Sequence, residues 1–512
     1  MSTATRIIKN TGFLYIKMMI TVFISLYTTR LVLNSLGASD FGIFNIVGGA
    51  IAMLGFLNAA MASATQRFMS FAEGAGNKDE LKTIFNVSLI LHIVIAFIVG
   101  VLLTVAGFVF FNGILNIPEN RMQAAYVVYG SLVVSTMFTI MNVPYDAVLN
   151  AHENMKYYAI VGILETLLKL IVAFICVYTI CDKLIVFGIL MACIPFITLS
   201  VMKVYCHKNY EECQIKPRKY WNVGCVKEML SFAGWNLMAS MVVMVSAYGQ
   251  GVILNSFFGP ILNAAQGVAG QLNGQLQALS SNMMKAFNPV FAKSAGANDK
   301  EQLFKVTWAG AKFSTALYLM IAVPFFFYTD FILRLWLKNV PEWTVVFVRL
   351  QLIRSSIEFM FVPLCKVINA NGKIKWFSVF SSASNIMQLP VIYLLFKLHY
   401  PPYVMYIVGI VFGNIIVYMM ALVLNRRYCG LSIRLYFVRA VFPILMSCAI
   451  CLLPAFVLMN NLPESSTYSL FSMVMIFVLF LISFFVVGCN KEEKKFINVA
   501  LGKLKFWGRG AR

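Results

Sequence analysis

Long apolar runs follow one another along almost the whole chain, separated by short polar stretches. A helix needs about 20 predominantly apolar residues to cross a hydrocarbon core of about 30 Å. About fourteen windows of this kind occur, and the one at 261–284 is the weakest. They lie near residues 11–33, 41–62, 84–112, 122–149, 157–180, 184–205, 229–256, 261–284, 304–329, 343–366, 375–397, 402–424, 436–459 and 466–489. The pattern predicts an all-α polytopic membrane protein with about fourteen transmembrane helices.

The composition agrees with this prediction, because 60% of the residues are hydrophobic and only 12% are charged. The net charge of +21 raises the question of nucleic acid. If the N-terminus is cytoplasmic, about 31 of the 41 Lys and Arg residues fall in segments on the cytoplasmic side and about 6 in the opposite loops. This bias predicts that both termini are cytoplasmic. It also explains the charge without nucleic acid, since basic loops face an anionic leaflet.

Two pairs of sequence windows repeat at nearly the same offset. Residues 141–161 (MNVPYDAVLNAHENMKYYAIV) align with 360–380 (MFVPLCKVINANGKIKWFSVF), and GAGNKDEL from residue 74 aligns with GANDKEQL from residue 296. Six helices separate equivalent points, so the two halves have the same orientation, as in the parallel repeats of transporters. We expect one six-helix lobe at 1–220, a second at 221–430, two accessory helices at 431–490 and a basic cytoplasmic tail at 491–512.

The cysteines and the start of the chain suggest no further chemistry. The eleven Cys mostly lie in apolar runs, and the one CxxC spacing, from Cys448 to Cys451, also falls inside such a run. Disulfides, metal sites and cofactors are therefore not expected. The basic and then apolar N-terminal segment resembles the start of a signal peptide, but no small-residue cleavage site precedes Arg30, so we expect this segment to be retained.

A polar turn interrupts the apolar pattern at residues 30–49. Arg30 stands where the first apolar helix ends. Arginine is costly in hydrocarbon, so its side chain either extends to the interface beside Tyr27 or marks a water-filled path, a partner or a substrate. Similar residues recur at 253–270, in agreement with the repeat.

The weak window at 261–284 is unusually rich in amides and glycines. Its polar residues include Gln266, Gln271, Asn273, Gln275 and Gln277. An unpaired amide in an apolar medium costs about 2 to 7 kcal/mol, so these side chains either line a cavity or bind a neighbouring helix. The sequence leaves both alternatives open, and Gln271 and Gln275 are our cavity candidates.

Several charges lie inside the predicted spans. Glu165 and Lys169, like Arg354 and Glu358, are four residues apart on a helix, and each pair can neutralise itself. Arg349 and Lys312 have no local partner, although Lys312 is close enough to a helix end to extend to the interface. The unmatched charge is cationic, and arginine offers a planar fork of donors to phosphate oxygens. A cavity lined by Arg30, Arg349, Arg354 and Lys312 would therefore favour a phosphate or carboxylate ligand.

Two further groups of residues are candidates for coupling and for movement. The acids Glu165, Glu358 and Asp146 could couple an ion to transport, although each also has a simpler pairing or interface role. Pro144 and Pro363 lie at equivalent positions of the repeat, where the missing N–H and the ring permit a kink. These kinks are either fixed by packing or serve as hinges.

Short motifs resemble those of a known family. Arg30, Leu36-Gly37 and Phe41-Gly42 resemble the pattern that opens the polysaccharide-export flippases of the multidrug/oligosaccharidyl-lipid/polysaccharide (MOP) exporter superfamily, especially Wzx-type O-antigen flippases. Phe41 stands where Tyr is commoner. Gln66-Arg67-Phe68 and Ala151-His152-Glu153 are similar to stretches of lipopolysaccharide biosynthesis members.

The resemblance implies a two-lobe MATE/MOP-like transporter. It would flip an undecaprenyl-diphosphate-linked oligosaccharide, such as an O-antigen or capsule repeat unit, across the bacterial cytoplasmic (inner) membrane by alternating access. Its partners would be the lipid-linked glycan, membrane lipids, an H+ or Na+ counter-ion and other polysaccharide assembly proteins.

Other classes of protein fit the sequence less well. A drug or cation antiporter of the same fold should keep an acid in its first helix, but no Asp or Glu lies between Met1 and Leu36. A membrane glycosyltransferase or polymerase would need a sizeable outer loop with catalytic acids, whereas the longest outer segments, near 112–122 and 329–343, are short. No Walker GxxxxGK[ST] motif occurs, so no ATP hydrolysis is expected. Because the outer segments are short, we do not expect an enzyme.

Overall fold

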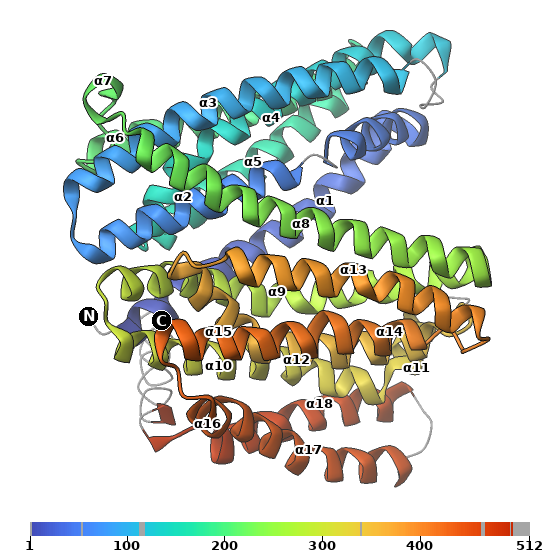
Figure 1. Cartoon of the computed structure of the whole chain (residues 1–512). Helices are drawn as coiled ribbons and strands as arrows, with labels where there is room; N and C mark the ends of the chain where they lie inside the picture. The colour runs from blue at the N-terminus through green and yellow to red at the C-terminus, as the bar shows by residue number, and fades with distance from the viewer. Residues whose placement is uncertain are drawn as a thin grey trace, which may run out of the picture. The chain divides into compact units, whose positions relative to one another are not determined.

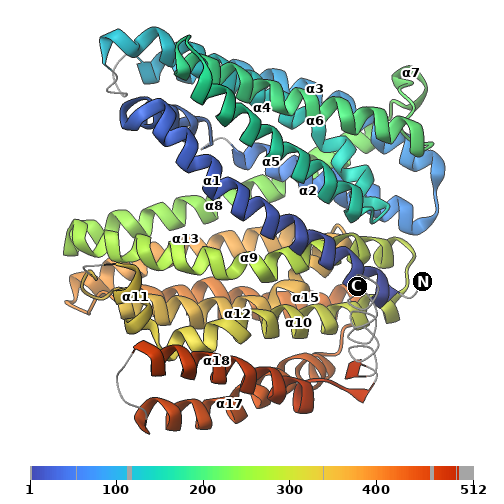
Figure 2. The same ribbon diagram turned by 180° about the vertical axis from the view of Figure 1, so that it is seen from behind.

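The computed structural model describes residues 3–52, 55–111, 118–337, 340–461, 466–491 and 493–494. Within these ranges the chain is helical and contains no strand (Figures 1 and 2). The elements are α1 (Thr3–Ala52), α2 (Gly55–Ala75), α3 (Lys78–Val109), η2 (Glu119–Arg121), α4 (Met122–Ala151), α5 (Met155–Tyr178), α6 (Lys183–Asn209), α7 (Pro217–Tyr220), α8 (Val223–Phe258), α9 (Pro260–Gly296), α10 (Lys300–Phe327), α11 (Thr329–Trp336), α12 (Thr344–Ala370), α13 (Lys375–Lys397), α14 (Val404–Val408), η3 (Gly409–Ile416), α15 (Val417–Cys429), α16 (Ile433–Tyr436), η4 (Phe437–Val441), α17 (Phe442–Asn461), α18 (Ser466–Ser483) and η5 (Phe484–Gly488). Of the η elements, η2 is a 3₁₀-helix and η3, η4 and η5 are π-helices.

Polar caps begin several of these helices after the short loops. Asn77 accepts a hydrogen bond from the Glu80 backbone N–H before α3, and Asn154 accepts one from the Tyr157 N–H before α5. Asp182 accepts two backbone N–H groups at the start of α6. Each cap satisfies donors that have no partner inside the helix.

The internal repeat is visible in the backbone at three pairs of turn residues with positive φ. Gly37 and Gly259 have φ of 77° and 78°, and each lies where one long apolar helix gives way to the next. Gly76 matches Asn298 (φ 71° and 53°), and Glu153 matches Gly372 (φ 55° and 75°). Since L-residues with a side chain rarely adopt this conformation, three such pairs at offsets of about 220 residues support the predicted duplication.

The predicted windows all fall on helices of the structure. Eleven helices in the described part of the chain are long and apolar enough to cross a membrane. The helices α2, α9 and α12 are also long but do not reach this threshold. Two of them carry the polar residues noted above, the amides of α9 and the charges of α12. The predicted break between the first two helices is the non-helical Gly37 inside α1.

The described chain divides into two compact units. Unit 1 comprises Met1–Met241, Lys285–Asp299 and Asn369–Lys375, and unit 2 comprises Val242–Met284, Lys300–Ile368 and Trp376–Arg512. Unit 1 therefore contains the first repeat together with half of α8, the last part of α9 and the turn between α12 and α13. The division after Met241 lies near the lobe boundary predicted at 220, whereas no division lies near 430 or 490. The predicted lobe boundaries stay predictions.

In unit 1, α4 packs against α2, α3 and α6, and α1 packs along α5. One apolar core lies between α3 and α4 and includes Val99, Leu103, Ala125 and Val128, all at most 3% exposed. A second core joins α1, α5 and α6. This packing brings residues of α1, α4 and α5 close to one another inside the apolar part of the unit.

A large apolar core in the described part of unit 2 includes residues of α8, α9, α10, α12 and α13. The accessory helices α17 and α18 pair with each other and with α10 (Figure 1). Two glycines of the helix η3 face α12 within this unit, the buried Gly409 and the partly buried Gly413. Arg354 of α12 therefore lies beside backbone that carries no side chain.

Candidate functional site

Among the described side chains of unit 1, a group of four charged ones lies on the apolar helices α1, α4 and α5. Glu165 and Lys169 of α5 form an ion pair of 2.7 Å, which confirms the local pairing that their spacing suggests. Both side chains remain more than 40% exposed. Asp146 of α4 accepts a hydrogen bond of 3.2 Å from Asn142 one turn earlier. This carboxylate has no ion-pair partner among the side chains that the structure describes.

Lys17 of α1 completes this group, and sequence reasoning did not select it as a site residue. Its ammonium lies 4.3 Å from the centre of the Tyr158 ring and directly over Gly162 of α5, where any larger residue would collide with it. Glu165 and Asp146 supply the negative charges that act on it. No described carboxylate comes within 4 Å of Lys17, so its charge is neutralised only at a distance. The signal available in the sequence was a single lysine inside the first apolar window.

In unit 2, Arg354 and Glu358 do not form the expected close ion pair, although the charge of Arg354 still acts on Glu358. No ion pair forms between these two side chains, both of which are described and partly exposed. The Arg354 guanidinium instead lies over Gly409 and Gly413 of η3, with its two terminal nitrogens 3.4 and 3.3 Å from the positions that Cβ atoms would take. The reason is steric, because the two glycines leave room for a planar group at this point.

Polar side chains of α13 and α8 surround the same place. Gln388 donates to Ser246 at 2.7 Å, and its own carbonyl oxygen is buried without a hydrogen-bond partner. The side-chain amide oxygen of Asn385 (Oδ1) lies 3.7 Å from the position that a Cβ atom would take at Gly413. The Arg354 guanidinium makes no hydrogen bond with a described residue, and its N–H groups are donors that suit an oxygen-rich anion.

The two other predicted cations of unit 2 have partners. Arg349 donates from Nε to the Phe326 carbonyl of α10 at 3.1 Å and lies over the Phe326 ring. Lys312, with its side chain 4% exposed, binds both carboxylate oxygens of Glu493 at 2.9 and 2.7 Å. Lys312 does not extend to an interface, because Glu493 neutralises it where it is buried. These contacts give Arg349 and Lys312 structural roles. Arg354 is therefore the better candidate for binding an anionic ligand.

The amides of α9 divide into two groups. Asn273 accepts hydrogen bonds from Tyr318 and Ser355 at 2.8 and 2.9 Å, and Gln277 donates to Ser355 at 2.8 Å. Gln271 and Gln275 are exposed. Asn273 and Gln277 therefore bind neighbouring helices, whereas a cavity lined by Gln271 and Gln275 stays a prediction.

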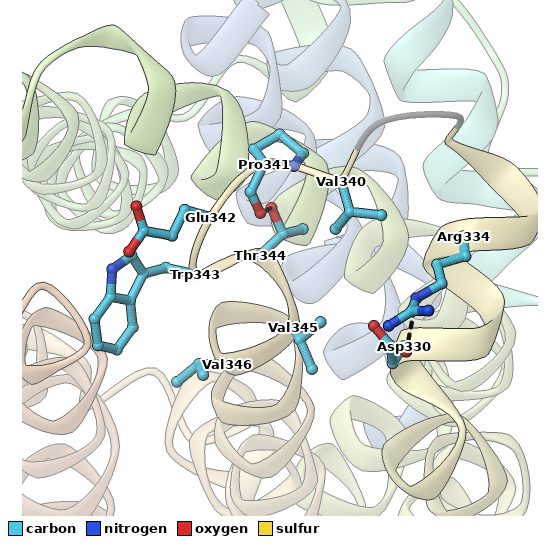
Figure 3. A pocket seen from close by; sticks show the side chains of 9 residues that line it. All are labelled: Asp330, Arg334, Val340, Pro341, Glu342, Trp343, Thr344, Val345 and Val346. Atoms are coloured by element: carbon cyan, nitrogen blue, oxygen red, sulfur yellow. Dashed lines mark hydrogen bonds and ion pairs between the residues drawn. The ribbon is translucent and has the colours of Figure 1, made fainter.

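Two open pockets lie in unit 2. One is lined by α11 and the residues that lead into α12, where Arg334 and Asp330 form an ion pair of 2.9 Å (Figure 3). None of the predicted site residues lines it. The other lies between α8 and α9 beside the Gly259 turn, and Asn255, Asn263 and Gln266 give it a polar lining. This second pocket belongs to the repeated motif that the sequence singled out.

Pro144 and Pro363 both lie inside long helices, α4 and α12, and both are buried. Their role as hinges stays a prediction. The backbone of Arg30 lies in α1, but its side chain is outside the described part of the structure.

A network of charges in unit 1 joins segments that are distant in sequence. Glu153, whose side chain is 1% exposed, is 2.7 Å from Arg6 and 3.2 Å from Lys293. The neighbouring His152 contacts Glu212 at 2.5 Å and Glu73 at 3.3 Å. Lys293 belongs to α9, so this network ties the second repeat to the first. Sequence reasoning named His152 and Glu153 only as part of a family motif.

Electrostatics set the charge of His152, which lies outside the spanning helices. Burial alone would lower the pKa of His152, but its hydrogen bonds with Glu212 and Glu73, together with their negative charges, raise it to about 9. With His152 protonated, the network contains three positive and three negative groups. The charges of the network therefore sum to zero at neutral pH.

The family model MatE matches the chain twice, over residues 14–175 and 235–394, which together cover more than half of it. The two matches begin 221 residues apart and confirm the duplication. Among curated proteins, no sequence matches this chain.

The similarity to solved structures with this fold extends over nearly the whole length of those chains. A MATE in the bent conformation is 15% identical, with a TM-score of 0.70 over 84% of this chain and 96% of the other. An outward-facing multidrug resistance MATE family transporter of the MOP superfamily is 16% identical, with a TM-score of 0.68 over 84% and 96%.

A MOP superfamily transporter from Pyrococcus furiosus, described as having a binding pocket of reverse polarity, is 14% identical, with a TM-score of 0.68 over 84% and 96%. At these identities the similarity concerns the fold alone. The repeated family match extends to the sequence, and on that ground this chain belongs to the MatE family of membrane transporters.

Proposed function

We propose that this chain moves an anionic lipid-linked oligosaccharide, held by its diphosphate, across the bacterial cytoplasmic membrane by alternating access. The observation that carries the proposal is Arg354, a partly exposed guanidinium within the long helix α12 that forms no ion pair with a described carboxylate. Arginine inside a span needs water, a partner or a ligand, and a diphosphate matches its planar donors.

Other features support a substrate with a charged head and a polar sugar. Lys17 adds a second cation without a close counter-ion in the described part of unit 1. The exposed amides Gln271 and Gln275 offer hydrogen bonds to hydroxyl groups. The Pyrococcus furiosus protein, whose binding pocket of reverse polarity suggests a different function, is a precedent for a change of function within this fold.

The test is glycan export in a strain that lacks the wild-type gene. Arg354→Ala should abolish most export, and Arg354→Lys should restore little of it, because an ammonium cannot bind a phosphate with two parallel hydrogen bonds. Arg334→Ala, which removes an exposed arginine that is paired with Asp330, is the matched control and should export normally. Full export by Arg354→Ala at an equal amount of protein in the membrane would refute the proposal.

A small-solute antiporter is the second candidate, and the acids of unit 1 favour it. Asp146 and Glu165 lie within the spans near Lys17 and could exchange H+ or Na+. Proteoliposomes with an imposed proton or sodium gradient would test this function through efflux of a cationic dye. Efflux that is lost in Asp146→Asn, combined with normal glycan export by Arg354→Ala, would favour the antiporter.

We also propose that both termini are cytoplasmic, as the distribution of Lys and Arg suggests. Reporter fusions after Lys219 and Arg427 should then signal cytoplasm, and a fusion after Pro341 the opposite side. Other polysaccharide assembly proteins would be the expected partners in the same membrane.

A further inference from the structure

Unit 2 contains a basic surface segment that the transport proposal does not use. No acidic residue occurs between Glu358 and Glu464, while four arginines lie within the seventeen residues from Arg426 to Phe442. They are Arg426, Arg427, Arg434 and Arg439. All four are exposed, and none forms an ion pair with a described residue. Their charge therefore remains available to a ligand.

The backbone of this segment is held firmly. Helix α15 ends at Cys429 with the left-handed Gly430 (φ 76°), and the Ser432 hydroxyl caps the following turn by accepting the Leu435 N–H. Tyr436 is fully buried, and its hydroxyl donates to the Met360 carbonyl of α12 at 2.5 Å. Arg434 and Arg439 thus flank an anchored residue, so little order has to be gained when a ligand binds.

Trp308 of α10 orients one of the arginines. The Arg439 guanidinium carbon lies 4.5 Å from the centre of the Trp308 ring. A guanidinium that stacks on an aromatic face keeps its N–H groups free at the edge, where they can donate to phosphate oxygens.

Apolar side chains are exposed in the same segment. Phe437, Val438 and Phe442 are 39%, 56% and 58% exposed, beside the two arginines. The segment also begins the candidate span Ile433–Val457, so it lies at a membrane interface in a chain that crosses the membrane. A surface that combines free guanidinium groups with exposed apolar side chains at this depth matches a ligand with a phosphate and an acyl chain.

We propose that Arg434 and Arg439, with Trp308 behind Arg439, bind the headgroup of an anionic phospholipid, and that Phe437, Val438 and Phe442 contact its acyl chains. This site is separate from Arg354 and does not depend on which substrate the protein transports. Each basic residue near an anionic membrane surface contributes about 1 kcal/mol, so each arginine should change lipid binding about fivefold.

The experiment uses the purified full-length protein and native mass spectrometry. The probes are dioleoyl phosphatidylglycerol and dioleoyl phosphatidylcholine, which share their acyl chains and differ in net charge. The wild-type protein should retain phosphatidylglycerol preferentially. Arg434→Gln and Arg439→Gln should each reduce this preference about fivefold, and the double variant should come close to parity.

Arg218→Gln/Lys219→Gln is the matched control, because it removes two exposed basic residues from α7 in unit 1. It should leave the preference unchanged. An undiminished preference in the Arg434→Gln/Arg439→Gln variant would overturn the proposal, and so would an equal loss in the control, since that would indicate a general charge effect. Displacement of phosphatidylglycerol by inorganic phosphate, but not by chloride at the same ionic strength, would identify a phosphate site and overturn the lipid as its occupant.

Discussion

Gly74 and Gly296 occupy the same helix crossing, and each faces the backbone of the other's helix. A Cβ atom at Gly74 would meet the carbonyl group of Lys293, and one at Gly296 would meet the carbonyl group of Phe71. The two glycines are 222 residues apart, as are Phe71 and Lys293. Residues at equivalent positions of the repeat therefore form a symmetric contact within unit 1, where only glycine permits this approach.

Gly74→Ala and Gly296→Ala should each destabilise the protein by about 1 to 3 kcal/mol, because the added methyl group forces the two backbones apart. Thermal unfolding of the purified protein in detergent is the measurement. Gly130→Ala, at a helical glycine with open space around its Cβ position, is the control and should cause no loss. Unchanged stability in both crossing variants would show that the helices can separate at little cost.

Glu153→Gln should destabilise the protein more strongly than most single substitutions. The change leaves Arg6 and Lys293 next to a buried neutral group, and removing one member of a buried ion pair costs about 3 to 5 kcal/mol. Glu211→Gln is the control, because Glu211 and its partner Lys78 are both more than 70% exposed. A Glu153→Gln variant as stable as this control would contradict the assigned role of the network.

The stability that His152 contributes should fall at alkaline pH. Since the pKa of His152 is raised from 6.5 to about 9 in the folded protein, its contribution is fully present below pH 6.5 and is lost as the pH rises through about 9. The wild-type unfolding temperature should therefore drop more between pH 7 and pH 9.5 than that of His152→Gln. His399→Gln, at an exposed histidine of unit 2, should behave like the wild type. An identical pH profile for His152→Gln and the wild type would argue against the raised pKa.

Lys312 and Glu493 should show strong coupling in a double-mutant cycle. Glu493→Gln leaves the buried Lys312 ammonium without its counter-ion and should cost about 3 to 5 kcal/mol. Lys312→Met/Glu493→Gln should recover most of that loss, because an apolar residue of similar volume often replaces a buried ion pair without penalty. Additive effects of the two single substitutions would mean that the pair is not coupled.

Much of the architecture follows from the sequence alone. The spacing of the apolar windows predicts the helices, because hydrocarbon thickness sets their length. The windows at 74 and 296 and those at 141 and 360 predict the duplication, which the paired positive-φ turns and the repeated family match confirm. The ion pair between Glu165 and Lys169 was also predictable, since both residues lie on one helix.

Only the tertiary structure decides which of the remaining charges are free. Arg354 and Glu358 have the same spacing as Glu165 and Lys169, yet Arg354 turns to glycines of η3 more than fifty residues away. Lys312 finds Glu493, and Glu153 finds Arg6 and Lys293, across distances in sequence that no local rule covers. Local spacing determines which partners a helical side chain can reach on its own helix, whereas packing between helices determines which partner it takes. For this reason the sequence alone could name the cations of the spans, but it could not separate a binding candidate such as Arg354 from a neutralised one such as Lys312.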